Sequence, residues 1–465
     1  MPIKSVITPD VFLHIPPSVQ AHDRSPDVTR FLESGSAGSS PKDGPASDSM
    51  LGEDETRTTP TQRRSLTLVF FITGNPGLIA YYHPFLSLLV ERLKQKEEEA
   101  ERPVVVAGFS LGGFDGEPSR WATTEANSRS GNDDRSVDEE MVQEMLHPTL
   151  RSRQASEDYN DDKIYTLREQ IELTYARLEA LVARLRLQFR RDNYGSDDES
   201  ELEPVQVVLM GHSVGTYIAL ELVRLWHERE VQHPASKMEL GREREENGPS
   251  WTVSSCILLT PTIVDLHMSP SGRIATPLLT SIPVLSAYLP DLAHGLLHSV
   301  LIRGLPSKWI ASLVARVTGM HVGSHGFDAT MAFLTSRRGV RQALTMAAAE
   351  LKEIRADQWG AEVWGAAVDE EEGDTTRVLR ACGSTRRSPR LYLWFAKEDH
   401  WVADITREEI LRSKVGAEGE NGGRTRPTIV IDETAGLVHA WCLEQSDMVA
   451  ERVGEWLEEI LEHSA

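Results

Sequence analysis

The stretch VQVVLMGHSVGTYIALELVRLW, residues 205–226, decides the fold of this chain. It begins with an apolar run rich in β-branched side chains, Val205–Met210, which predicts a buried strand. The pentamer GHSVG at residues 211–215 follows directly and matches the G-x-S-x-G pattern of a nucleophile elbow. Residues 216–226 then carry apolar side chains at helical spacing. A strand, a sharp turn and a helix in this order predict that Ser213 is a nucleophile.

The two glycines of the pentamer have a steric reason. Side chains at Gly211 and Gly215 would strike the neighbouring strand and helix, because the serine between them sits in a tight, strained turn. The bare pattern is weak evidence, since such a pentamer arises by chance in roughly one chain in several of this length. The strand before it and the helix after it make it specific. The alternative is an ordinary glycine-rich turn that buries its serine.

Short apolar runs elsewhere in the chain alternate with helical patterns. Residues 82–93 and 164–189 carry apolar side chains at helical spacing, and so does the stripe from Val449 to Ile460. This alternation predicts an α/β fold with a doubly wound, mostly parallel sheet covered on both faces, which is the α/β-hydrolase architecture. The other runs that predict strands are residues 66–72, 103–107, 253–259, 391–396 and 428–431.

Polar stretches interrupt this pattern and divide the chain. They offer too little apolar surface to offset the entropy of ordering, so we expect disordered or solvated inserts there. We predict an N-terminal, partly disordered extension (1–65), a first core part (66–263), a helical cap (264–350) and a second core part (351–465). The inserts are residues 34–64, 115–160, 193–204, 228–250, 366–390 and 414–426.

The segment at residues 274–320 is more apolar than one covering helix requires. It lies between two predicted core strands, Pro283 and Pro290 break it, and Asp291 interrupts it. We expect a helical cap whose outer face contacts a lipid surface. A cap packed entirely on the core is the alternative. The chain has no run of about 20 uninterrupted apolar residues, so we do not expect a simple membrane-spanning helix.

A serine nucleophile requires an acid to orient its base, and the acid follows the serine along the chain in this fold class. Asp399 stands three residues past the predicted strand at 391–396, where a loop can aim its carboxylate at the site. It would fix the tautomer of the catalytic histidine and stabilise the imidazolium. Glu398 and Asp404 are the alternatives.

The base is expected after the last strand. His439 follows the run at 428–431 and precedes the C-terminal helix, which is where the order serine, acid, histidine requires a histidine. His400 is the competitor, but its position next to Asp399 in the chain makes a side-chain pairing awkward.

Acyl transfer also requires donors for the oxyanion. One should be the backbone N–H after the nucleophile, that of Val214. The turn TGNPG at residues 73–77 follows a predicted strand, and the N–H of Asn75 is the natural second donor, worth about 3 kcal/mol if preorganised. Gly74 and Gly77 would let this turn approach the substrate closely. An ordinary strand-to-helix turn is the alternative.

Composition excludes other classes of function. The formal net charge of −22 argues against nucleic-acid binding, which requires a basic surface. Cys256, Cys382 and Cys442 are too few for a disulfide framework, which fits a reducing compartment. His321 and His325 have the spacing of metal ligands but lack a third partner, so we expect no metal and no cofactor.

Taken together, these motifs make the chain resemble the lipid droplet-associated hydrolase family. The pairing of a Gly-Asn-Pro-Gly turn with Gly-His-Ser-x-Gly is fairly specific, and the resemblance covers most of residues 66–462 apart from the inserts. It rests on residues 72–77, Tyr81, Tyr82, Phe85, Leu167, Gln170, Ile171, residues 211–217, residues 259–262, Asp399 and His439.

The resemblance implies a carboxylic-ester hydrolase with a triad at Ser213, Asp399 and His439. It also implies attachment to the surface of the lipid droplet or of the endoplasmic reticulum. We expect the cytosolic face, with the apolar segment at residues 274–320 as the part that makes the contact. Lipid esters, either sterol esters or acylglycerols, are the implied substrates. The long insert at 115–160 and the polar N-terminal extension depart from the family pattern and put access to the site in doubt.

Two classes of function follow. The leading hypothesis is a serine hydrolase of lipid esters, with a thioesterase or peptidase on the same triad as variants. A serine at residue 213 disfavours dehalogenase and epoxide hydrolase chemistry, which uses a carboxylate nucleophile there. The second class is a catalytically weak hydrolase-fold protein that acts as a structural factor on lipid droplets.

Overall fold

The polar inserts that the sequence predicts lie mostly outside the residues that the computed structural model describes. Residues 34–64 and almost all of 115–160 lie outside the described residues, so the expectation of disorder there stays a prediction. The described residues are 4–17, 19, 65–100, 103–114, 145–146, 163–194, 204–236, 250–281, 283–364, 388–415, 427–432 and 436–463.

An eight-stranded sheet lies at the centre of the molecule, with strand order β1-β2-β4-β3-β5-β6-β7-β8. Strands β3 to β8 pair in parallel, and β1 and β2 pair antiparallel. The mostly parallel sheet that the sequence predicts is therefore confirmed. The strands are β1 (Val6–Thr8), β2 (Val11–His14), β3 (Thr67–Ile72), β4 (Val104–Phe109), β5 (Val205–His212), β6 (Trp251–Leu259), β7 (Arg390–Ala396) and β8 (Thr428–Asp432).

The first two strands were not predicted, since residues 1–65 were assigned to a partly disordered extension. Residues 6–14 instead form a hairpin that pairs with the edge of β4. Val11, Phe12 and Leu13 are buried there, so this segment belongs to the core. Strands of three and four residues are too short to show the alternation of apolar and polar residues by which a strand is predicted from sequence.

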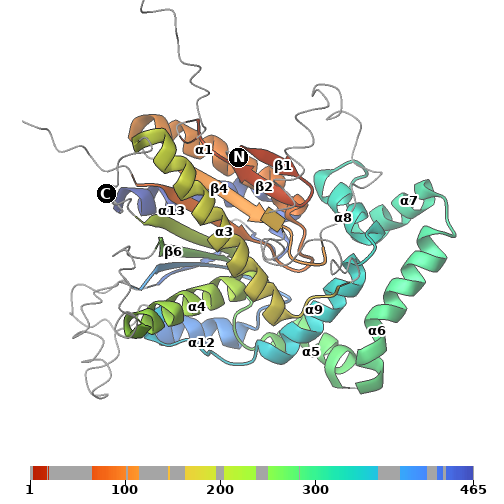
Figure 1. Ribbon diagram of the computed structural model, residues 1–465. Helices are drawn as coiled ribbons and strands as arrows, with labels where there is room; N and C mark the ends of the chain where they lie inside the picture. Colours follow the sequence, from red (N-terminus) through yellow and green to blue (C-terminus); the bar gives the residue numbers. More distant parts are fainter. Residues whose placement is uncertain are drawn as a thin grey trace, which may run out of the picture.

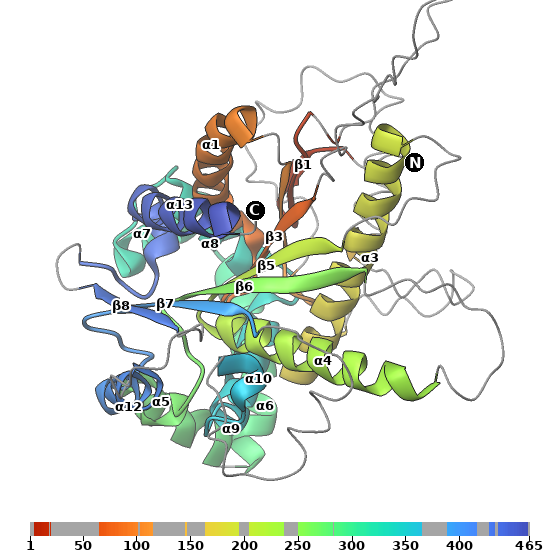
Figure 2. The same cartoon turned by 90° about the vertical axis from the view of Figure 1, so that its left-hand side faces the viewer.

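Helices cover both faces of the sheet (Figure 2), as the doubly wound prediction requires. Helices α1 and α13 pack together on one face, and α4 and α12 lie on the other, where α3 packs beside α4. Helix α4 continues to Ser236, past residue 228 where a polar insert was expected. The bounds are α1 (His83–Ala100), α3 (Leu167–Tyr194), α4 (Val214–Ser236), α12 (Asp404–Val415) and α13 (Ser446–His463), with a 3-10 turn η2 (Ile79–Tyr82) before α1.

The order of the strands explains where a site can form. From β3 the chain goes to β4 on one side and then to β5 on the other, so the crossovers leave a crevice at the carboxyl ends of β3 and β5. Open α/β sheets bind ligands at such a switch point. The segments that follow β3, β5, β7 and β8 all emerge at these carboxyl ends, and they carry the residues that the sequence singles out.

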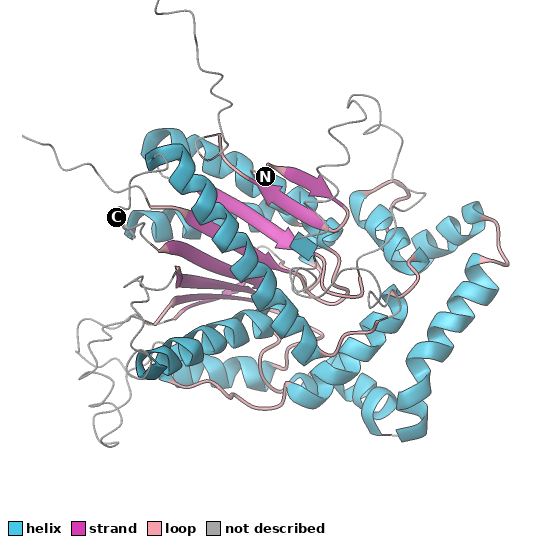
Figure 3. Cartoon of the chain, in the orientation of Figure 1, coloured by secondary structure: helices cyan, strands magenta, loops and turns pink. Residues whose placement is uncertain are grey.

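All the described secondary-structure elements between β6 and β7 are helices. Most of them stand to one side of the sheet (Figures 1 and 3), whereas α10 (Ala361–Trp364) packs against α4. Helices α6 and α7 project furthest from it. The predicted boundary at residue 350 falls inside α9, which runs to Glu353. The elements are η5 (Leu266–Met268), α5 (Pro270–Thr276), η6 (Pro277–Ser281), α6 (Pro283–Leu296), η7 (Leu297–Ile302), α7 (Ser307–Thr318), α8 (His325–Thr335), α9 (Gly339–Glu353) and α10 (Ala361–Trp364).

We use the term cap for residues 264–353. Helix α9 joins the cap to the core, because it packs against α3 of the core as well as against α6 and α8 of the cap. Within the described ranges, no helix is both long enough and apolar enough to cross a membrane.

Candidate active site

Ser213 lies at the turn between β5 and α4, in a backbone conformation that few residues with a side chain adopt. Its φ angle is 53°, in the left-handed region. A Cβ on Gly215 would overlap the carbonyl oxygens of Ile72 and Thr73, and one on Gly211 would overlap Gly215 itself. Gly215 is therefore required because the start of α4 presses against the end of β3, and Gly211 because the end of β5 presses against the start of α4.

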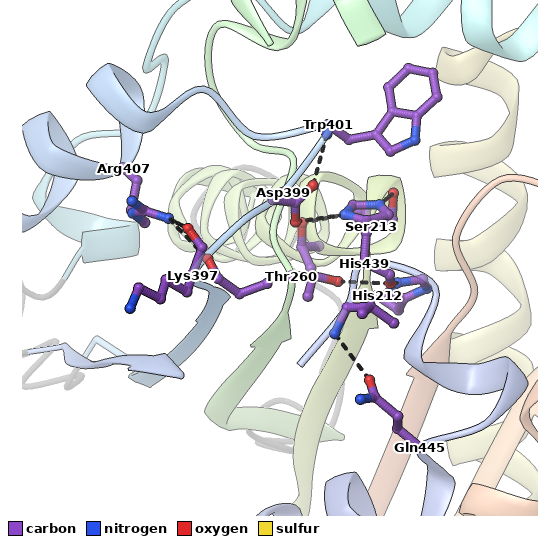
Figure 4. A network of polar contacts seen from close by, with 12 residues as sticks. His212, Ser213, Thr260, Lys397, Asp399, Trp401, Arg407, His439 and Gln445 are labelled. Carbon is purple, nitrogen blue, oxygen red and sulfur yellow. Dashed lines mark hydrogen bonds and ion pairs between the residues drawn. The ribbon is translucent and has the colours of Figure 1, made fainter. Parts of the chain in front are cut away.

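The structure brings Ser213, Asp399 and His439 together (Figure 4). The Nε2 atom of His439 lies 2.9 Å from Ser213 Oγ, and its Nδ1 atom lies 2.8 Å from Asp399 Oδ2. A carboxylate can only accept, so Nδ1 carries the proton and Nε2 presents a lone pair to the serine hydroxyl. This is the arrangement in which a histidine can take the hydroxyl proton.

The loop after β7 holds Asp399 in place. Its Oδ1 atom accepts the backbone N–H of Trp401 at 2.7 Å, and its side chain is only 2% exposed. The alternatives lie elsewhere: Glu398 and His400 are exposed, and Asp404 is paired with Arg407 at 3.0 Å. Burial and a fixed orientation therefore distinguish Asp399 from its neighbours.

The segment before His439 is held by two side chains. Asp432, the last residue of β8, accepts the N–H of Leu437 at 2.7 Å. Gln445 accepts the N–H of Val438 and donates to the carbonyl of Gly436, at 3.0 Å and 2.9 Å. The imidazole is thus carried on a segment that is anchored at both ends.

His212, the residue before the nucleophile, is part of a buried chain of hydrogen bonds that the sequence did not predict. Its Nε2 atom lies 2.8 Å from the carbonyl oxygen of His439, and its Nδ1 atom lies 2.7 Å from the hydroxyl of Tyr82. That hydroxyl accepts the N–H of Gly74 at 3.1 Å. The turn after β3 is therefore connected to the segment that carries the catalytic histidine.

The direction of these bonds is fixed by chemistry. A carbonyl can only accept, so His212 carries its proton on Nε2 and its Nδ1 accepts from Tyr82. Burial first, and the neighbouring His439, lower the pKa of His212 to about 3. His212 is therefore neutral at neutral pH. The feature of the sequence that could have indicated this role is the histidine at the first x of the G-x-S-x-G pattern.

The predicted oxyanion donors lie beside the nucleophile. Asn75 lines the same pocket as Ser213, and Val214 begins helix α4. Neither backbone N–H is used in a hydrogen bond among the described residues. Gly74 is close enough to His212 and Ser213 that an added Cβ would lie 2.9 Å and 3.1 Å from their side chains, and one on Gly77 would lie 2.7 Å from Leu111. The turn at 73–77 therefore packs directly against the elbow.

A pocket opens in front of Ser213, and both the core and the cap line it. It has a volume of about 270 Å³, near the lower end for ligand pockets, and most of its lining is apolar. Tyr82, Trp401 and Glu350 line this pocket, although no pattern in the sequence predicts them as pocket residues. The lining includes Asn75, Tyr82, His212, Ser213, Leu266, Met320, Thr330, Ala347, Glu350, Leu351, Trp401, His439 and Cys442.

Among the described residues, no three His, Cys, Asp or Glu side chains are grouped so that they could hold a metal ion. His321 is exposed, and His325 is half-buried against the ring of His83 at a centroid distance of 6.3 Å.

Comparison with known proteins places the chain in a family. The model of the family described as lipid-droplet associated hydrolase matches residues 65–442. Lipid droplet-associated hydrolase of Gallus gallus is 24% identical over 421 residues, which cover 90% of this chain and 91% of that protein. The Mus musculus protein of the same name is 26% identical over 215 residues, or 46% of this chain and 43% of the relative. The alignments to the mammalian relatives thus span less than half of those proteins.

The solved structures to which the chain is similar are more distant. Haloalkane dehalogenase DbeA from Bradyrhizobium elkani is 11% identical with a TM-score of 0.40, and the match covers 86% of this chain and 92% of that one. A laboratory-evolved potato epoxide hydrolase is 9% identical with a TM-score of 0.35, covering 85% and 94% of the two chains. The family match does not depend on these similarities, since it spans most of the sequence by itself. The chain belongs to the lipid droplet-associated hydrolase family and has an α/β-hydrolase fold.

Proposed function

We propose that the protein is a serine hydrolase that cleaves carboxylic esters of lipids, either sterol esters or acylglycerols, through an acyl-enzyme on Ser213. The observation that carries the proposal is the relay of Asp399, His439 and Ser213, with separations of 2.8 Å and 2.9 Å. His439 takes the proton of the serine hydroxyl while Oγ attacks the ester carbonyl. It then gives that proton to the departing alcohol, and a water activated by the same histidine releases the acid.

The N–H groups of Asn75 and Val214 would stabilise the oxyanion in both steps. Their freedom from other hydrogen bonds supports this role. Serine reacts here with carbonyl carbon rather than with a carbon–halogen bond or an epoxide, because those reactions use a carboxylate nucleophile. The apolar pocket favours an acyl chain over a charged substrate, and its volume of about 270 Å³ suits part of a lipid ester rather than the whole molecule.

A fluorophosphonate probe tests the nucleophile. We expect the wild-type protein to be labelled and Ser213→Ala to be unlabelled, with ester turnover lowered by roughly 10⁴-fold or more because the covalent step is lost. Ser312→Ala, which changes an exposed serine of α7, is the matched control and should label normally. Labelling that survives in Ser213→Ala would contradict the assignment.

The outer face of the cap supports action at a lipid surface. Helices α6 and α7 each present three apolar side chains at intervals of four residues, which aligns them along one face of each helix. Ile310 and Val314 lie on the adjacent face of α7 and are buried in a cluster with Phe327. The side chains in these two rows are 43–76% exposed: Tyr288, Leu292 and Leu296 on α6, and Trp309, Leu313 and Val317 on α7.

The charges beside these rows also favour a lipid surface. The net charge of the chain is −22, yet α7 carries Lys308 and Arg316 and no acid. Both basic side chains are exposed and flank the apolar row, where they can meet anionic headgroups. Basic residues beside an exposed apolar face are typical of helices that lie in a lipid interface.

Flotation with artificial triacylglycerol droplets coated with phospholipid tests this surface. We expect wild-type protein to float with the droplets and the double variant Trp309→Glu, Leu313→Glu to stay in the aqueous layer. Hydrolysis of soluble p-nitrophenyl butyrate should change less than about twofold, since neither residue lines the pocket. Ile405→Glu is the matched control, because Ile405 is 64% exposed on α12, far from these rows in the sequence. A double variant that floats like wild type would count against the lipid-facing role.

A catalytically weak droplet-binding protein is the second candidate, and the same exposed rows favour it. If Ser213→Ala leaves a cellular lipid phenotype intact while the double variant abolishes it, the protein acts as a structural factor. Purified protein assayed on cholesteryl oleate, triolein, oleoyl-CoA and a casein peptide separates lipid esterase from thioesterase and peptidase. Fractionation of cells tests the expected location at droplets and at the cytosolic face of the endoplasmic reticulum.

A further inference from the structure

One buried acid of the pocket has no part in the reaction described above. Glu350 lies near the end of helix α9, is 6% exposed, and faces the pocket that contains Ser213. Its neighbours Ala347 and Leu351 line the same pocket and are apolar. A carboxyl in such a place is costly unless it is neutral or hydrogen-bonded, which calls for a physical reason.

Glu350 is bonded to the turn that carries the predicted oxyanion donor. The Nδ2 atom of Asn75 lies 2.9 Å from Glu350 Oε1 and 3.0 Å from the backbone oxygen of Ala343. Residues 343 and 350 are two turns apart on α9. The carbonyl of a helix points toward its C-terminus and the side chain leans toward its N-terminus, so the two acceptors converge on one point.

The orientation of the Asn75 amide follows from these partners. The Ala343 carbonyl can only accept, so the NH₂ end of the amide faces α9 and its second proton goes to Glu350. Burial raises the pKa of Glu350 to about 8, an effect that the hydrogen bond from Asn75 opposes. At neutral pH the acid is mainly uncharged, and its carbonyl oxygen remains an acceptor.

The backbone of Asn75 is thus fixed from two sides. The preceding N–H, that of Gly74, is bonded to Tyr82 in the core, whereas the Asn75 side chain is bonded to the cap. The turn contains Gly74 and Gly77, which leave the backbone many alternative conformations, so an aligned N–H requires such anchors.

We propose that Glu350 is a positioning residue of the oxyanion hole, which holds Asn75 through the bond from Asn75 Nδ2 to Glu350 Oε1 so that the Asn75 N–H points at the developing oxyanion. The inference rests on the proposed esterase function. It makes the cap a contributor to catalysis as well as a lipid-facing surface. Because α9 supplies both acceptors, the oxyanion turn and the cap are mechanically connected.

Two substitutions of similar volume test the proposal. Glu350→Gln keeps an acceptor oxygen without a charge, and Glu350→Met removes it. With p-nitrophenyl butyrate we expect kcat of the Gln protein to stay within about threefold of wild type. We expect kcat of the Met protein to fall about 10- to 100-fold at unchanged KM, because only the transition state uses the oxyanion donors. Glu353→Ala, an exposed acid one turn further along α9, should behave like wild type.

The outcomes separate this inference from the function on which it rests. If Ser213→Ala hydrolyses the ester at the wild-type rate, the proposed esterase function itself is contradicted. Serine-dependent turnover with equal kcat for the Gln and Met proteins would overturn only the role of Glu350, and so would a change confined to KM. If the Met protein fails to fold, Glu350→Asp is used in its place. The aspartate side chain is one methylene shorter, so its acceptor oxygen lies further from Asn75 Nδ2. Full kcat in the Asp protein would then overturn the proposal.

Discussion

At the scale of single residues, the site depends on hydrogen bonds whose direction is forced. His212 can donate only from Nε2, because its partner there is the carbonyl of His439, and Tyr82 then has to donate to Nδ1. Burial raises the pKa of Tyr82 well above its ordinary value, so the phenol keeps its proton. The uncharged side chains of Tyr82 and His212 thereby set the spacing between the turn at 73–77 and the segment that carries His439.

We predict that Tyr82→Phe weakens both folding and catalysis. It leaves the N–H of Gly74 and Nδ1 of His212 buried without partners, which should cost about 1–3 kcal/mol in the free energy of unfolding. We expect kcat to fall about tenfold, since both the oxyanion turn and the segment carrying His439 lose a support. Urea unfolding and p-nitrophenyl butyrate kinetics measure the two effects.

The adjacent tyrosine is the control for this prediction. Tyr81 is also buried, but its hydroxyl donates to Thr330 of the cap, which itself donates to the carbonyl of Gly326. Tyr81→Phe should therefore change the free energy of unfolding by less than about 1 kcal/mol. Equal effects of the two substitutions would mean that the bonds of Tyr82 have no special role.

At the scale of elements, the elbow requires that α4 begin directly against the end of β3. No atom larger than hydrogen fits at Gly215, because the carbonyls of Ile72 and Thr73 occupy the space. The strained φ of Ser213 is maintained by this contact and by pairing of β5 with β3 and β6. The catalytic serine is thus positioned by packing between elements and not by its own preference.

We predict that Gly215→Ala destabilises the protein by roughly 3 kcal/mol, because α4 has to move away from β3. Gly295→Ala in α6 is the matched control, since a methyl group there meets no other atom within 4 Å. That substitution should leave stability unchanged or raise it by about 0.5–1 kcal/mol through helix propensity. Thermal and urea unfolding compare the two proteins. Equal stability would show that the tight contact between α4 and β3 is not required.

At the scale of the whole molecule, buried histidines make stability depend on pH. Burial is the largest cause that lowers the pKa values of His14 and His83 to about 4 and that of His212 to about 3. In the unfolded chain these rings take up protons near pH 6.5, whereas in the folded state they do not until about pH 4 or below. Acidification from pH 6.5 to 4 therefore favours the unfolded chain.

Glu350 acts in the opposite direction. Its raised pKa of about 8 means that the folded state retains this proton while the unfolded chain loses it near pH 4.5, so this contribution to stability falls as pH rises from 4.5 to 8. Among the described residues, the pKa values of His294 and His325 are also lowered and that of Glu353 is also raised, in each case mainly by burial. The histidines therefore outnumber the acids, and we predict that the melting temperature falls between pH 6.5 and 4.5. Differential scanning calorimetry measures it.

His83→Phe serves as the control for this dependence. It keeps an aromatic ring against Phe12, whose centroid lies 6.0 Å from that of His83, and removes one titrating group. The drop in melting temperature between pH 6.5 and 4.5 should be smaller in this variant than in wild type. A drop of equal size would mean that His83 has no part in the acid sensitivity.

The features that the sequence by itself determined are those carried by local pattern. Apolar runs and helical spacing predicted the parallel strands and the main helices, and the strand–turn–helix order around residues 205–226 predicted the position of Ser213. Chain order after the elbow selected Asp399 and His439, and these are the residues that lie within hydrogen-bond distance of one another and of Ser213. Periodicity and order along the chain are local properties, so they can be found without coordinates.

Only the tertiary structure decided the contacts between distant segments. Residues 6–14 join the sheet because β4 offers them an edge, the tautomer of His212 depends on a carbonyl 227 residues away, and Glu350 meets Asn75 across 275 residues. Glu350, the single acid in the run AAAEL at 347–351, has no sequence feature that predicts its contact with Asn75. The physical reason is that these interactions depend on where folded elements pack, and a local pattern does not specify the distance between elements far apart in the chain.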